Sequence, residues 1–149
     1  MAVCLVCLLA SVHIYAQQRV ELPLVAKNNG MLLVEVKVND KPYLFLLDSA
    51  GLTAVNNKRF GLPVESVELI RVSTAYGEQP MTFGKVRVHK FSVGDHNWTD
   101  FLMRTRPFAP MEEATRSDLG GILGYDTLIK WNRWTVDYEE KKLILESRP

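Results

Sequence analysis

The residue of this chain best placed to do chemistry is Asp48, which follows the apolar run 43–47 and precedes Ser49, Ala50 and Gly51. A short apolar run after the turn-like segment 39–42 predicts a strand that is buried on both faces. A carboxylate at the end of such a strand is costly to bury unless polar groups compensate it. Ser49 and Gly51 allow a sharp turn that brings backbone amides toward it. The segment therefore suits delivery of one acid to a sheltered site, and the alternative is an aspartate that caps a turn or a helix.

Apolar and alternating segments on both sides of Asp48 predict a mostly β protein with one closed or nearly closed barrel and one short helix. Pro23 has no amide hydrogen, which places the first strand at a sheet edge. Gly77 marks the tip of a hairpin. The predicted strands are residues 19–27, 32–38, 43–47, 53–55, 67–76, 80–93, 98–103, 119–124, 135–138 and 142–146.

Three segments are predicted to lie outside these strands. Residues 56–60 can form one helical turn that Gly61 ends. Residues 104–118 have mixed charge, two prolines and no clear period, so a long surface loop is expected. Asp126 is expected to cap the short helix that follows strand 119–124.

Residues 1–16 predict a secretory signal peptide. The stretch 2–10 is nearly all apolar and shorter than the roughly 20 residues that a membrane span needs, and cleavage is expected after Ala16. Residues 17–149 then form a single domain that is exported, either periplasmic or secreted, with no membrane attachment. Cys4 and Cys7 both lie in the predicted signal peptide, so the mature chain offers no disulfide, thiol chemistry or cysteine metal site.

Composition narrows the function classes further. The 149 residues carry 18 basic and 17 acidic side chains and no basic run, so nucleic acid is not an expected partner. The three histidines, His13, His89 and His96, are scattered and predict no metal site. No metal or cofactor is therefore expected.

Two separated stretches resemble one protein family. Segment 39–51 is similar to the active-site segment of retropepsin-like aspartic proteases, in which an apolar strand leads into Asp-Thr/Ser-Gly-Ala/Ser. Gly-Ile-Leu-Gly-Tyr-Asp-Thr-Leu at 121–128 resembles the second signature of the same family, a strand ending in glycine followed by a short helix. The hairpin between them resembles the flap. The resemblance covers roughly residues 20 to 146 and implies a small closed barrel of the acid-protease type.

The resemblance also implies a reaction. In such proteases two aspartates share a proton and activate a water that hydrolyses a peptide bond of a polypeptide substrate. Asp48 is the one aspartate of this chain in that sequence context, so the pair requires a homodimer. Ser49 is then expected to form a hydrogen bond across the two-fold axis. Tyr76 and Gly77 resemble the Tyr-Gly of pepsin-like flaps, where the tyrosine covers the substrate, and the alternative is an ordinary hairpin aromatic.

Ala50 and Gly51 depart from the family order, in which glycine comes before alanine. Either the methyl group of Ala50 crowds the paired acids, or the chain shifts so that Gly51 takes the close position. Two hypotheses follow: a homodimeric aspartic endopeptidase with Asp48 as its catalytic residue, and a catalytically inactive peptide-binding or interaction module of the same fold. A third, a ligand-carrying barrel, has no supporting pattern in the sequence.

Overall fold

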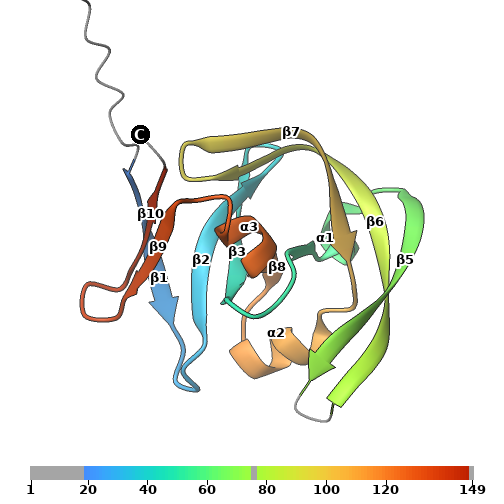
Figure 1. Ribbon diagram of the computed structural model, residues 1–149, viewed down its shortest axis with the longest axis horizontal. Coiled ribbons are helices and arrows are strands. Elements are labelled where there is room, and N and C mark those ends of the chain that lie inside the picture. The colour runs from blue at the N-terminus through green and yellow to red at the C-terminus, as the bar shows by residue number, and fades with distance from the viewer. Residues whose placement is uncertain (1–18, 75–76, 148–149) are drawn as a thin grey trace, which may run out of the picture.

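The computed structural model describes residues 19–74 and 77–147, and the predicted signal peptide lies outside them. Ten strands in this part of the chain form one connected set of pairings in the order β5-β6-β7-β4-β8-β3-β2-β1-β10-β9 (Figure 1). No helix in these residues is long and apolar enough to cross a membrane. The strands are β1 (Arg19–Ala26), β2 (Leu32–Val38), β3 (Lys41–Asp48), β4 (Ala54–Val55), β5 (Val64–Thr74), β6 (Gly77–Val93), β7 (His96–Thr105), β8 (Leu119–Gly124), β9 (Arg133–Asp137) and β10 (Lys142–Glu146).

A ring of six strands forms the centre of the described residues. Strand β6 pairs with β7 along most of its length and also with β2, where Val38 lies opposite Phe91. This second pairing closes β2, β3, β8, β4, β7 and β6 into the ring. Successive side chains of a strand point to opposite faces, which explains why the valines of β2 are buried while Glu35 and Lys37 are exposed. The predicted mostly β, barrel-like architecture is confirmed.

Strand β3 lies inside this ring, which is what positions Asp48. It pairs antiparallel with β2 and parallel with β8, so that Asp48 lies opposite Gly124 at the end of both strands. Phe45 is fully buried and packs in the same core as Val34 and Leu123. The apolar run therefore anchors the strand and leaves its last residue at the ring's end.

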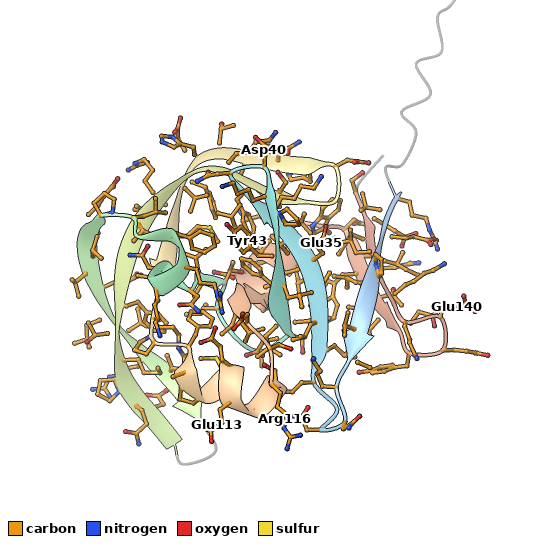
Figure 2. The ribbon with its side chains drawn as sticks, turned by 180° about the vertical axis from the view of Figure 1, so that it is seen from behind. Glu35, Asp40, Tyr43, Glu113, Arg116 and Glu140 are labelled. Atoms are coloured by element: carbon orange, nitrogen blue, oxygen red, sulfur yellow. The ribbon has the colours of Figure 1, made fainter. Side chains whose placement is uncertain are left out.

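Two extensions flank the ring on opposite sides (Figure 1). One is the long β5–β6 hairpin, whose strands pair from Val64 to Gly77. The other is the β9–β10 hairpin with β1, and Figure 2 shows Glu140 at its outer turn. The same view shows Asp40, in the β2–β3 turn, at the end opposite helix α2 (Ala109–Thr115), where Glu113 and the C-cap residue Arg116 lie.

The expectation of an edge strand at the N-terminus was wrong. Strand β1 pairs through its first half with β10 and through its second half with β2. Pro23 stands at the change of partner, opposite Lys142, so its missing amide hydrogen falls where one ladder gives way to the next. The proline marks a junction between sheets rather than an edge.

The described residues contain three short helices where the barrel prediction had one. Helix α1 (Asn57–Phe60) is the predicted helical turn, and Gly61 ends it with a φ of 61°. Helix α3 (Tyr125–Leu128) is the predicted helix after β8. Helix α2 interrupts the segment that was expected to be a loop; Pro110 lies in its first turn, where a missing amide hydrogen costs nothing.

Candidate active site

The carboxylate of Asp48 is held by the backbone of the residues that follow it. Its Oδ1 accepts hydrogen bonds from the amides of Ala50 at 3.1 Å and Gly51 at 2.9 Å. The Gly51 amide also lies 3.2 Å from the Asp48 carbonyl oxygen, which closes a tight turn. Asp48 is partly buried, and Ser49 and Ala50 are exposed. The sequence prediction of amides gathered around this carboxylate matches the geometry.

Gly51 occupies the crowded position of this loop. A Cβ added to it would lie 2.6 Å from Asp48 Cγ and closer still to Oδ2, a separation that real side chains do not adopt. Ala50, by contrast, has an exposed side chain. Within one chain, Gly51 is the residue that approaches the acid, and whether the Ala50 methyl crowds a second Asp48 stays a prediction. The glycine is therefore required at position 51.

The second sequence motif, residues 121–128, packs against residues 48–53, which we call the Asp48 loop. A Cβ on Gly124 would lie 2.5 Å from the backbone of Leu52 and Thr53, so only glycine fits here. The amide of Tyr125 donates to the Gly51 carbonyl at 2.9 Å. The Gly124 amide donates to Thr53 Oγ1, also at 2.9 Å. Both signatures named from the sequence thus form one continuous site.

Asp126 does not cap its helix, contrary to the sequence expectation. The N-cap of α3 is Gly124, and no side chain caps this helix. The carboxylate instead accepts the Thr53 amide hydrogen at Oδ1, 2.8 Å away, and pairs through Oδ2 with Arg104 at 3.1 Å. Beside it, the hydroxyls of Thr53 and Thr127 lie 2.7 Å apart. Asp126 therefore fixes the far end of the Asp48 loop.

An open groove of about 590 Å³ adjoins Asp48 and Ser49. One wall comes from the start of β2 and the end of β3, and the other from the C-terminal hairpin. Its side chains are mostly apolar or aromatic, which suits an extended peptide segment better than a charged ligand. The lining residues include Leu32, Leu46, Leu47, Trp134, Val136 and Tyr138.

A family model described as aspartyl protease matches residues 34–127, more than half of the chain. The chain belongs to the aspartyl protease family. Its fold is similar to the crystal structure of a retropepsin-like aspartic protease from Rickettsia conorii, with a TM-score of 0.54 and 12% identity, covering 89% of this chain and 95% of that chain. At this identity the likeness shows the fold alone. No curated protein matches the sequence.

The resemblance inferred from the two motifs is thereby confirmed at the level of family and fold. The individual site assignments remain predictions. Of the residues named for this aspartyl protease, Asp48, Ala50 and Gly51 share one hydrogen-bonded turn. Gly77 lies on the separate β5–β6 hairpin and begins β6 with a φ of 94°. Tyr76 lies outside the described residues.

Sequence reasoning missed Thr53 and Arg104. Thr53 lies close after the aspartyl protease motif in sequence. The sequence gives no hint of its role, because its buried hydroxyl bonds Gly124 and Thr127, which are distant along the chain. Arg104 lies 56 positions after Asp48 in a segment without periodicity. Within residues 19–74 and 77–147, no group of three or more His, Cys, Asp or Glu side chains could hold a metal ion.

Proposed function

We propose that the chain is an exported aspartic endopeptidase that becomes active as a homodimer. The observation that carries the proposal is the Asp48 carboxylate, held by two amides of its own turn at the end of β3 and bordered by the groove. Two copies related by a two-fold axis supply the two acids that the reaction needs. Ser49 is exposed next to Asp48, where a hydroxyl can reach a partner across that axis.

The reaction follows from the shared proton. Two carboxylates that approach closely cannot both ionise, so one Asp48 is protonated while its counterpart is charged. The charged carboxylate removes a proton from a water, which attacks the peptide carbonyl carbon, and the protonated one donates its proton to the carbonyl oxygen. Proton transfer to the amide nitrogen then breaks the C–N bond and releases two peptide products.

The groove supports an extended polypeptide as the substrate. Its apolar walls can hold apolar side chains, while the neighbouring strands offer backbone groups to a peptide in β conformation. The β5–β6 hairpin, in which Gly77 begins β6, is proposed to cover the bound peptide. The flap role of Tyr76 and Gly77 is part of this proposal and comes from the resemblance of their sequence to pepsin-like flaps. No cofactor takes part in this reaction scheme.

Peptide cleavage by the purified chain, with and without pepstatin, tests the proposal. Asp48→Asn keeps the shape of the side chain but removes the acid, so kcat/KM should fall by about 100- to 10,000-fold, the usual contribution of general acid–base catalysis. Asp95→Asn makes the same change on an exposed residue of the β6–β7 turn and serves as the control. Dimeric wild type that cleaves no peptide from acidic to neutral pH contradicts the proposal.

The second candidate is a peptide-binding module of the same fold without catalysis. The exposed Ala50 methyl favours it, because this group stands beside the acid that a second copy has to approach. Peptide binding with an affinity unaffected by Asp48→Asn, and without cleavage, would assign this function.

A further inference from the structure

A series of polar contacts connects the Asp48 loop to the β5–β6 hairpin. It begins at the Thr53 amide, which donates to Asp126 Oδ1. Arg104 then holds two carboxylates with one guanidinium group: its Nη1 lies 3.1 Å from Asp126 Oδ2, and its Nε lies 3.1 Å from Glu68 Oε2. Lys85 Nζ lies 3.3 Å from the same Glu68 oxygen.

Each member of this series comes from a different element. Thr53 belongs to the loop after β3, Asp126 to α3, Arg104 to β7 and Glu68 to β5. Arg104 also lies opposite Ala54 of β4, so its backbone is fixed next to the loop. A planar guanidinium can bond two acceptors at once in fixed directions, which a lysine cannot do.

Burial strengthens these contacts. The side chains of Arg104, Glu68 and Asp126 are 26%, 27% and 33% exposed, so water screens them less than a surface pair. Lys85 and Arg104 lie directly opposite each other on β6 and β7, and Glu68 between them offsets the repulsion of two like charges. Burial opposes the ionisation of Glu68, but Lys85 and Arg104 outweigh it and hold its pKa below the ordinary value.

We infer that Arg104 is a positioning residue through which the β5–β6 hairpin sets the geometry of the Asp48 loop. This inference rests on the proposed function, because the loop matters for catalysis only if Asp48 is catalytic. When the hairpin shifts toward or away from a peptide, Glu68 moves with it, and Arg104 conveys the shift through Asp126 to the Thr53 amide. The loop is then fully ordered only when the hairpin is in place.

A neighbouring ion pair supplies a matched control. Arg87 and Glu65 also connect β6 and β5, with two bonds of 2.8 Å. The third contact of Arg87 goes to the Asp100 carbonyl on β7. Glu65→Gln breaks this pair and removes one negative charge from β5, as Glu68→Gln does, but it leaves the contacts of Asp126 and Thr53 in place.

Amide hydrogen exchange at Thr53 in the purified full chain tests the connection without any substrate. Glu68→Gln should speed this exchange several-fold although Glu68 does not contact Thr53, and Glu65→Gln should leave it unchanged. In an Arg104→Met background, Glu68→Gln should have no further effect, because the connecting residue is gone. Equal effects of Glu68→Gln in both backgrounds, or equal effects of Glu65→Gln and Glu68→Gln, overturn the inference.

Kinetics test the consequence for catalysis. Arg104→Met should lower kcat and kcat/KM together by at least about 10-fold with little change in KM, the pattern of a lost transition-state geometry. Arg104→Lys keeps the charge but not the two-carboxylate geometry, so kcat should stay low. If Arg104→Met has the same kcat as Arg87→Met, the inference is overturned. Inactive wild type overturns the proposed function instead, and Thr53 exchange still decides whether Arg104 connects the two elements.

Discussion

At the scale of single residues, Ala50 and Gly51 show how contacts rather than motif order decide which residue must be small. The family order inferred from the resemblance has glycine directly after the hydroxyl residue, whereas this chain has alanine there. The Asp48 carboxylate lies against residue 51, and the side chain of residue 50 is exposed. The unusual order is therefore compatible with the turn that holds the acid.

This geometry predicts opposite tolerance at the two positions. Gly51→Ala forces a methyl group into the Asp48 carboxylate and should lower the free energy of unfolding by about 1–3 kcal/mol, as overpacking does. Ala50→Gly creates no contact and should cost at most about 1 kcal/mol through the entropy of the unfolded chain. Urea unfolding of both variants measures the difference. A Gly51→Ala variant as stable as wild type contradicts the proposed crowding.

Residue types and order were enough to predict the place of Asp48 at the end of a buried strand, with backbone amides around its carboxylate, because an acid after an apolar run followed by small residues is a local pattern. The roles of Thr53, Asp126 and Arg104 depend on contacts between distant segments. Asp126 illustrates the limit. Helix capping is the commonest local use of an aspartate at such a position, but its carboxylate instead pairs with Arg104 of β7.

At the scale of elements, the strands of the ring were predictable because alternation and apolar runs identify them. Helix α2 was not, because its stabilising contacts come from elsewhere in the chain. Glu112 accepts hydrogen bonds from the Arg59 side chain of α1 and from the Leu119 amide of β8. A seven-residue helix of ordinary propensity forms only with such tertiary support. The edge-strand error at Pro23 has the same origin, since β10 is remote in sequence.

Glu112 predicts a pH dependence of stability. The hydrogen bond from Arg59, followed by that from the Leu119 amide, holds the pKa of Glu112 below its ordinary value. A lowered folded-state pKa gives stability that is complete above the unfolded value of about 4.3 and is lost as the pH falls through the lower folded value. Glu112→Gln should therefore destabilise the protein at pH 6–7 and progressively less below about pH 4.3.

Urea midpoints of wild type and Glu112→Gln across this pH range measure the effect. Glu113→Gln, on an exposed neighbour of the same helix, is the control (Figure 2). A stability difference between wild type and Glu112→Gln that does not shrink toward acidic pH contradicts the role of its charge.

At the scale of the whole molecule, the proposed activity requires two chains. If wild type and Asp48→Asn are mixed in equal amounts and exchange freely, about half of the wild-type chains pair with an inactive partner. The activity per wild-type chain should then fall to about half of its unmixed value, and it should also fall on dilution. Activity that depends on neither mixing nor dilution contradicts the shared site.

Export makes a separate prediction. A chain recovered from outside the cytoplasm of the producing cell should begin at Gln17, since cleavage is expected after Ala16. Sequencing of its N-terminus measures this directly, and an intact Met1 would contradict the predicted signal peptide.

The pairing of β1 with β10 has a consequence for how the chain folds. Residues 19–23 are held by residues 142–146, so the first strand described has no companion on one side until nearly all of the chain is available. Such distant closure is slow because a long segment has to be brought together before the pairing gains anything. Under the proposed export, a polypeptide still threading through a translocation channel would therefore stay open at this seam, and it would complete its outer sheet only after release on the far side.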